Sequence, residues 1–234
     1  MPATFEGFTP DAVRFLLELR ANNDRAWFQP RKAEYERLLK EPLEALCMVL
    51  GEQFEARGIP LRADARSPFR IYRDVRFSKD KSPYKTYVSA SFAWAAEGAP
   101  RDPSSKTTDA HGVGGYFHFD PDEEYVGGGM WQPERPRLEA WRSLVANEPR
   151  RVHRAIDAPA FKAAFGQVSG DRLKRVPPGY PADHPDAELL KLKDVTFGRH
   201  LAADEALSPR LPEILTDAFA DATPVLRLLA GLAA

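Results

Sequence analysis

The spacing of apolar residues changes twice along this chain, and that change limits the folds it can adopt. Between residues 9 and 57, apolar side chains recur every three to four positions, which is the period of an amphipathic helix. Between residues 68 and 131 they recur mostly at every second position, which is the period of a half-buried strand. From residue 136 to residue 232 the helical spacing returns. The sequence therefore predicts a single α+β domain over residues 1–234, ordered as helix, sheet and helix.

Residues typical of helix ends set the limits of the predicted helices. Thr9-Pro10 is a typical helix start, and Gly58 ends the second helical region. The apolar stripe of that second region consists of Leu43, Leu46, Cys47, Leu50 and Phe54. After residue 136 we expect a helix, and two further helices at about 212–222 and 225–232.

Four segments carry the alternating pattern and are predicted to be strands. They are residues 69–77, 85–95, 115–120 and 124–130. The last two are joined by a short turn, and parallel pairing needs a crossover of about a dozen residues, so antiparallel pairing is expected. The polar segment 97–114 is predicted to be an exposed, mobile loop. The predicted architecture is an antiparallel sheet of about four or more strands, with N-terminal and C-terminal helices packed mainly on one face.

Charge and cysteine content exclude several classes of protein. The chain has 33 Lys and Arg residues against 34 Asp and Glu residues, which excludes a generally basic nucleic-acid coat and an acidic tail protein. The single cysteine, Cys47, excludes an intrachain disulfide framework and favours a reducing compartment. No apolar run approaches the roughly 18 residues of a membrane span, and the N-terminus lacks a signal-peptide pattern. These features predict a soluble cytoplasmic protein without a membrane partner.

Positive charge is concentrated in residues 66–87, at the start of the predicted sheet. This segment holds seven Lys and Arg residues and two Asp residues, so its local charge is +5. If its two strands share a buried face, their polar faces also share one side of the sheet, where Tyr87, Ser89 and Ser91 join the cations. Such a surface suits phosphate or carboxylate groups. The predicted ligand-binding residues are Arg70, Arg73, Arg76, Lys79, Lys81, Tyr84 and Lys85.

A phosphate-bearing ligand, either a nucleotide or a nucleic-acid backbone, is the leading hypothesis for this segment. Asp74 would orient an arginine or act as a base, which makes it a candidate catalytic residue, but whether the protein is an enzyme stays open. Two alternatives remain: docking of an acidic protein without catalysis, and a structural salt-bridge lattice with no ligand. Arg73 lies on the apolar face of its predicted strand, so it is either buried and paired or turned outward by a β-bulge.

Few other residues indicate chemistry. His118 shares a predicted strand face with Tyr116 and Asp120, so it is a second candidate for proton transfer, beside the plainer interpretation of a surface histidine. The histidines and the cysteine form no metal-binding pattern, and the glycine-rich nucleotide-binding patterns are missing, so no metal and no cofactor are predicted. Gly127–Gly129 is interpreted as a bulge or a close strand contact near Trp131, with phosphate binding as the alternative.

The charged pattern of the basic segment resembles that of a known family. The pattern R-x-x-R-D-x-R-F-x-x-D-K-x-x-Y begins at Arg70 and ends at Tyr84. It is similar to the signature of a widespread bacterial family of about this length, known only as a domain of unknown function. The opening FEGFTPD, the GGGMWQPE segment and the later LLKLKD resemble other blocks of that family. The resemblance implies a shared fold and a soluble bacterial protein, and it implies no activity.

Overall fold

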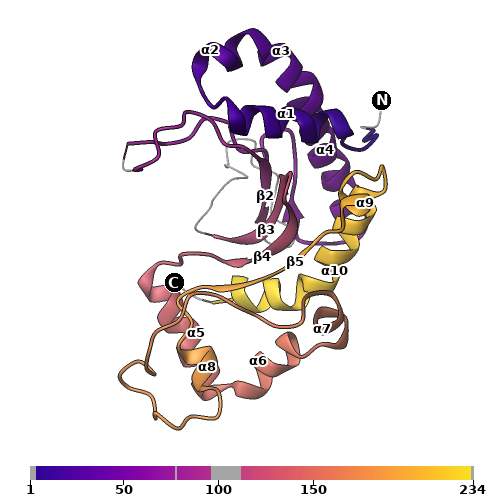
Figure 1. Cartoon of the computed structure of the whole chain (residues 1–234). Helices are drawn as coiled ribbons and strands as arrows, with labels where there is room; N and C mark the ends of the chain where they lie inside the picture. Colours follow the sequence, from indigo (N-terminus) through magenta and orange to yellow (C-terminus); the bar gives the residue numbers. More distant parts are fainter. Residues whose placement is uncertain (1–3, 77, 96–111, 233–234) are drawn as a thin grey trace.

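The structure is a computed structural model that describes residues 4–76, 78–95 and 112–232. At its centre is a five-stranded antiparallel sheet in the order β1-β2-β3-β4-β5, with helices above it, below it and along one face (Figure 1). The strands are β1 (Leu61–Arg62), β2 (Val88–Trp94), β3 (Val113–Asp120), β4 (Glu123–Met130) and β5 (Val195–His200). The predicted α+β class with an antiparallel sheet is confirmed. Most of the predicted loop at 97–114 lies outside the described residues.

The N-terminal helices form where the sequence predicts them. Helix α1 (Pro10–Ala21) starts after Thr9 and carries proline at its first position, where a missing amide costs little. The following helical region consists of α2 (Arg25–Phe28), a 3-10 turn (Gln29–Arg31), α3 (Lys32–Tyr35), a π-helical turn (Glu36–Lys40) and α4 (Glu41–Ala56). Asp24 caps α2, because its carboxylate accepts a hydrogen bond from the Trp27 amide at 2.9 Å. The predicted apolar stripe of α4 is buried.

The C-terminal helices end in one long helix rather than two short ones. They are α5 (Arg135–Asn147), α6 (Pro149–Ile156), α7 (Pro159–Phe165), α8 (Ala187–Leu190), α9 (Ala203–Ala206) and α10 (Leu211–Ala230). The predicted break between residues 222 and 225 was wrong, since Pro224 lies inside α10. Leu215 before the proline and Leu229 after it are both fully buried. Burial on both sides outweighs the backbone amide that proline lacks.

Residues 67–76 and 78–87 form a hairpin-like arm that projects from the sheet beside β2 (Figure 1). The predicted strand at 69–77 was wrong, because the only pairing of its residues within the described chain is through isolated bridges and single backbone hydrogen bonds. One bridge joins Pro68 to Ala90, and another joins Tyr72 to Tyr84. Pro68 and Pro83 both lack the amide that a regular ladder needs. The arm carries the basic segment away from the sheet instead of spreading it along a strand.

Strands β1 and β5 were not predicted. β1 has only two residues and pairs with the end of β2. β5 pairs with β4 along its whole length, yet its buried positions are only Val195 and Phe197 before Gly198 interrupts the pattern. Alternation over so few residues is too short to indicate a strand.

The helix-facing side of the sheet holds the centre of the core. Phe54 of α4, Phe92 of β2 and Phe219 of α10 meet edge to face, with ring centroids 5.5, 5.6 and 5.8 Å apart. Gly115 of β3 makes room for this packing, since a Cβ atom there would lie 2.5 Å from the Phe219 ring. Helices from both ends of the chain, α4 and α10, therefore cover one face of the sheet and do not cover its other face.

Candidate functional site

The face of the sheet that turns away from α4 and α10 carries polar and aromatic side chains. Burial alternates along β3, where residues 113, 115, 117 and 119 are buried and residues 114, 116, 118 and 120 are partly exposed. Strand pairing places Ser89 opposite His118, Ser91 opposite Tyr116, and Tyr116 opposite Gly127 on this open face. The expectation that Ser89, Ser91 and His118 share one polar face agrees with this register.

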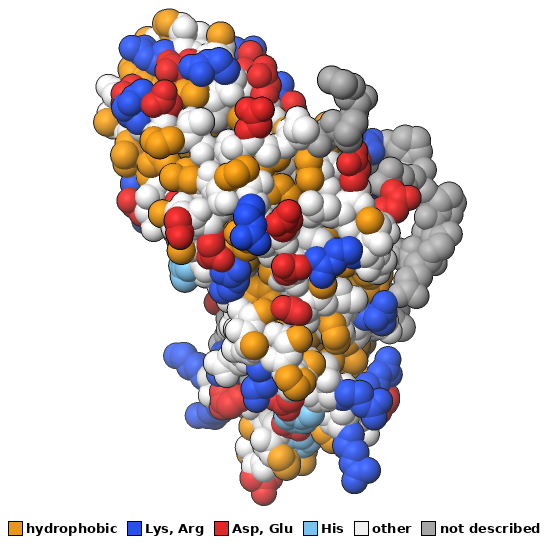
Figure 2. All heavy atoms as spheres, turned by 90° about the vertical axis from the view of Figure 1, so that its right-hand side faces the viewer, with side chains coloured by type: hydrophobic (Ala, Val, Ile, Leu, Met, Phe, Trp, Pro, Cys, Tyr) orange, Lys and Arg blue, Asp and Glu red, His pale blue; other side chains and the backbone are white. Residues whose placement is uncertain are grey.

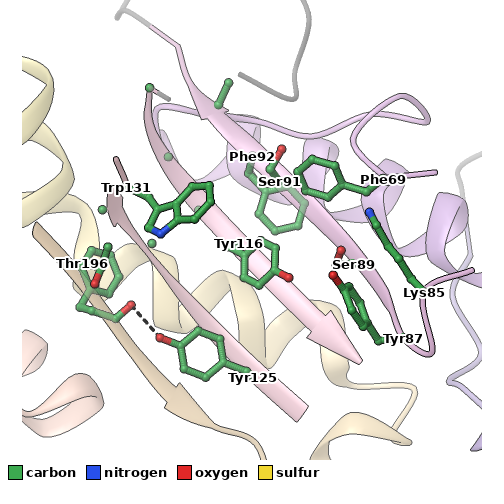
Figure 3. Close-up of a pocket in the computed structure, with 17 residues that line it drawn as sticks. Phe69, Lys85, Tyr87, Ser89, Ser91, Phe92, Tyr116, Tyr125, Trp131 and Thr196 are labelled. Carbon is green, nitrogen blue, oxygen red and sulfur yellow. Dashed lines mark hydrogen bonds between the residues drawn. The ribbon is translucent and has the colours of Figure 1, made fainter. Parts of the chain in front are cut away.

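A pocket of about 510 Å³ opens on this face (Figure 3). Its volume lies in the range of roughly 300–1,000 Å³ that is typical of small-molecule sites. The side chains that define it belong to Phe69, Lys85, Tyr87, Ser89, Ser91, Tyr116, Tyr125, Trp131 and Thr196. Figure 3 shows Trp131 and Lys85 toward opposite ends, with Tyr116 between them. The pocket therefore has an aromatic end and a cationic end.

Glycines form much of the pocket floor. Gly114, Gly128 and Gly129 line it. Gly129 has a φ of +121°, a conformation that favours glycine. Beside the floor, the phenol of Tyr125 lies against Gly198, where a Cβ atom would approach the phenol oxygen to 1.8 Å. The floor is therefore bare backbone, and a flat group can approach it closely.

Burial raises the pKa values of the phenols of the pocket and lowers the pKa of the neighbouring imidazole. Desolvation raises the pKa of Tyr116 to about 12 and also raises the pKa of Tyr87 and of Tyr125. Desolvation lowers the pKa of His118, whose Nδ1 lies 2.9 Å from the Tyr116 hydroxyl. The His118 ring also packs on Tyr87, with centroids 4.4 Å apart. His118 thus lies behind these two phenols and fixes their positions.

Lys85 supplies the positive charge of the pocket. Its ammonium lies 5.0 Å from the Phe69 ring centroid and 5.7 Å from the Tyr87 ring centroid, within the range of cation–π attraction. Desolvation, followed by the charge of Arg70, lowers the pKa of Lys85. Within residues 4–76, 78–95 and 112–232, no carboxylate pairs with this ammonium. The charge of Lys85 is therefore only partly solvated and is not neutralised by the described chain.

Arg73 is engaged on the arm, outside the pocket. Its guanidinium forms an ion pair with Asp80, and the side chain is 29% exposed. The hydrogen bonds from Arg73 and from Ser82 lower the pKa of Asp80. Arg73 is thus paired yet partly exposed. The two predicted alternatives, a buried paired residue or a β-bulge, both assumed a regular strand, and the described residues of this segment form none.

Arg76 and Asp74 form a second ion pair near the tip of the arm. Nη2 of Arg76 lies 2.6 Å from a carboxylate oxygen of Asp74, and the hydrogen bond between the side chains lowers the pKa of Asp74 to about 2. Lys81 donates a hydrogen bond to the Val75 carbonyl at 2.9 Å, and Lys79 is exposed. These predicted site residues, Asp74 included, do not line the pocket.

Tyr84 anchors the base of the arm in the core. Its side chain is 1% exposed, and its ring stacks on Phe28 with centroids 4.1 Å apart. The amide of Asn23 donates to the Tyr84 carbonyl at 2.9 Å, and the Tyr84 amide donates to Asn23 Oδ1 at 3.1 Å. This pair of hydrogen bonds fixes the position of Lys85, the next residue, relative to the α1–α2 corner.

Trp131, Tyr125 and Thr196 are pocket residues that the sequence did not single out. Thr196 reaches the pocket because β4 pairs with β5, a strand that was not predicted, whereas Tyr125 comes from the predicted strand β4, where it pairs with His118. Trp131 follows β4 directly and is 51% exposed, which is high for so large an apolar ring. A tryptophan two positions after a run of three glycines, with only Met130 between them, is the signal that would have indicated it.

Outside the arm, charges of both signs are mixed. Figure 2 shows basic and acidic side chains interspersed over one side of the molecule. Among the ion pairs outside the arm, Arg57 pairs with Asp217, and Arg20 bridges Asp120 and Asp122 at 2.9 and 2.5 Å.

Other functional features have little support in the described residues. No group of three His, Cys, Asp or Glu side chains there is placed to hold a metal ion. Cys47 is buried in α4, and desolvation raises the pKa of its thiol. No helix in the described ranges is long and apolar enough to cross a membrane.

Comparison with known proteins gives a family but no precedent for a site. The family described as "Conserved hypothetical protein (DUF2461)" matches residues 11–227, a range that includes the arm and every residue of the pocket. No curated protein and no solved structure matches the chain significantly. The resemblance inferred from the charged pattern is confirmed, and the chain belongs to the DUF2461 family of conserved hypothetical proteins.

Proposed function

We propose that this protein binds a compact phosphate-bearing ligand in the open-face pocket, with Lys85 contacting the phosphate. The observation that carries this proposal is the Lys85 ammonium, which lines the pocket, is partly desolvated and has no carboxylate partner in the described chain. Holding a cation partly out of water is costly unless an anion compensates it. A phosphate group supplies that anion together with several hydrogen-bond acceptors.

Arg70 strengthens the argument for phosphate over a singly charged anion. It is exposed, it forms no ion pair with another described residue, and its charge contributes to the lowered pKa of Lys85. Two cations that repel each other are both stabilised by a group carrying nearly two negative charges, which phosphate monoesters do at neutral pH.

The distribution of charge favours a compact ligand over a long nucleic acid. A nucleic-acid strand needs cations repeated along its path. The neighbouring hollow beside Trp131 is lined by Lys193, and its ammonium already pairs with Asp171 at 3.2 Å. Lys85 is the one cation among the described residues that line the pocket, and it lies toward the end opposite Trp131.

The ion pairs of the arm support a structural role for part of the basic segment. Arg73 and Arg76 each pair with a carboxylate of the same arm, as the structural alternative requires for those two residues. Acidic-protein docking would instead use the exposed tip, including Lys79. The two alternatives and the phosphate proposal involve different residues, so substitutions separate them.

Calorimetric titration tests the proposal with inorganic phosphate, pyrophosphate, ribose 5-phosphate and a single-stranded oligonucleotide. We expect at least one small phosphate compound to bind. Lys85→Met should lower its affinity by about tenfold or more, since a hydrogen bond to a charged group contributes roughly 1.5–3 kcal/mol. Lys79→Met, on the exposed tip of the same arm, is the matched control and should bind like the wild type. The salt dependence should be shallow, as for one or two neutralised phosphates.

Two results would overturn the proposal. One is that none of the small phosphate compounds binds to the folded protein. The other is that Lys85→Met binds them as tightly as the wild type does. Tight oligonucleotide binding with a steep salt dependence, and no binding of the small compounds, would favour the nucleic-acid backbone instead.

A further inference from the structure

Trp131 indicates a second property of the ligand. Its indole is 51% exposed at the rim of the pocket, while most other large aromatic side chains of the described chain are buried. The indole also lines a second hollow of about 530 Å³, together with Gln132 and Asp194. An indole that borders two open spaces has a ring face available for stacking, and covering that face is favourable.

The position of Trp131 is fixed by an unusual turn. Gln132, the next residue, has a φ of +45°, and it is the one described residue other than glycine with a positive φ. Its amide donates a hydrogen bond of 2.6 Å to Asp194, whose side chain is nearly buried beside β5. A conformation of this kind costs free energy, and strained residues cluster at functional sites. The turn therefore holds the indole at the end of β4.

The pocket floor beside Trp131 is shaped for a flat group. Gly114 and Gly129 are paired on neighbouring strands, and both line the pocket. Neither can carry a side chain easily, because a Cβ atom would lie 2.3 Å from the Phe92 carbonyl at Gly114 and 2.2 Å from the Val195 carbonyl at Gly129. Figure 3 shows the Trp131 indole over this part of the sheet, with Tyr116 beside it. A planar ring can thus lie on the backbone between two aromatic side chains.

We propose that the ligand is a nucleotide whose base stacks on Trp131 while its phosphate contacts Lys85; this inference rests on the proposed phosphate-binding function and deepens it. Both side chains line the same pocket of about 510 Å³, and Figure 3 shows them toward its opposite ends, as the base and the phosphate of one nucleotide require. Stacking on an aromatic ring selects bases in general, because every base has a π-face.

The test compares three probes that share parts of one structure: adenosine monophosphate, ribose 5-phosphate, which lacks the base, and adenosine, which lacks the phosphate. We expect the affinity of the wild-type protein for adenosine monophosphate to exceed its affinity for ribose 5-phosphate by about tenfold or more. Trp131→Ala should lower the affinity for adenosine monophosphate by about tenfold, as loss of one base–aromatic stack does. It should leave the affinity for ribose 5-phosphate unchanged. Lys85→Met should weaken both phosphate compounds. Tyr72→Leu, which removes a comparably exposed ring outside the pocket, is the control and should change neither.

The outcomes separate this inference from the proposed function. Equal binding of adenosine monophosphate and ribose 5-phosphate, unaffected by Trp131→Ala, would overturn the nucleotide inference and leave phosphate binding standing. Binding of adenosine monophosphate that depends on Trp131 but not on Lys85 would overturn the phosphate function and the nucleotide assignment together, and leave only ring stacking. Failure of all three probes to bind the folded protein would overturn both proposals. An oligonucleotide that binds far more tightly than the monophosphate would replace the compact ligand with a single strand.

Discussion

The contact between Asn23 and Tyr84 provides a test of how the arm is held to the fold. The Asn23 side chain hydrogen-bonds both backbone groups of Tyr84, at 2.9 and 3.1 Å, and Tyr84 is almost completely buried. Asn23→Ala removes both partners at once and leaves a buried amide and a buried carbonyl without a hydrogen bond. Each such group costs roughly 1–3 kcal/mol, so we expect the free energy of unfolding to fall by about 2–4 kcal/mol.

Urea denaturation measures this loss, because the midpoint should shift while the slope stays constant. The matched control is Asn22→Ala at the neighbouring position. Asn22 is exposed and donates to the Glu18 carbonyl within its own helix, so its loss should change stability by less than about 0.5 kcal/mol. Hydrogen exchange at the Tyr84 amide should accelerate in Asn23→Ala and not in Asn22→Ala.

The same substitution links stability to binding. Lys85 follows Tyr84 directly, so loosening the base of the arm should also weaken binding of small phosphate compounds in the folded protein. If Asn23→Ala lost less than about 0.5 kcal/mol of stability and kept slow exchange at Tyr84, the view that this contact fastens the arm would be wrong.

Three further predictions concern packing and protonation. Gly115→Ala places a Cβ atom 2.5 Å from the Phe219 ring, and both groups lie in the core, so the free energy of unfolding measured with urea should fall by about 1–3 kcal/mol. An unchanged free energy would contradict the tight packing of α10 on β3. His153 lies between Asp157 and Asp186 at 2.7 Å from each, and their hydrogen bonds raise the pKa of His153. Its charged form therefore stabilises the fold below about pH 6.5, and the contribution is lost as the pH rises through the raised value, so His153→Gln should lower the melting temperature at pH 5.5 more than at pH 9. Desolvation lowers the pKa of Lys85, so its ammonium loses its charge at a lower pH than that of an ordinary lysine, and the affinity for ribose 5-phosphate should fall from that pH upward. Lys85→Arg keeps the charge and should remove this fall.

The elements that the sequence predicted correctly are those whose local signals are long and regular. Helices α1 and α4 have both a clear apolar stripe and a recognisable end, and strand β3 alternates over all eight of its residues. The strand predicted at 69–77 was wrong because Phe69, Ile71 and Val75 alternate as in a strand, while the prolines that prevent regular pairing lie on both sides of the hairpin. The helix break predicted near Pro224 was wrong because burial of both halves of α10 depends on contacts distant in sequence.

The sequence predicted site residues correctly only where alternation within a single strand was enough to place their side chains on one face. Alternation alone places Ser89 and Ser91 on one face, and it places His118 with Tyr116 on the next strand. Trp131 could not be predicted in its role, since its position depends on the Gln132 turn and on Asp194, which lies 62 residues farther along the chain. A count of charges gave the excess on residues 66–87, but it could not tell which cations are paired. Arg73 and Arg76 find carboxylates on the arm and Lys85 finds none in the described chain, a distinction that only side-chain positions reveal.

The meeting of Phe54, Phe92 and Phe219 affects how the protein can fold during its synthesis. The ribosome delivers the first two rings well before the third, and at about 5–20 residues per second the delay is roughly 6 to 25 seconds. Throughout that interval α4 and the nascent sheet lack the helix that will cover them, so their apolar surface is exposed to other nascent chains and to chaperones. A truncation that removes α10 should accordingly yield an aggregating polypeptide rather than a smaller soluble one.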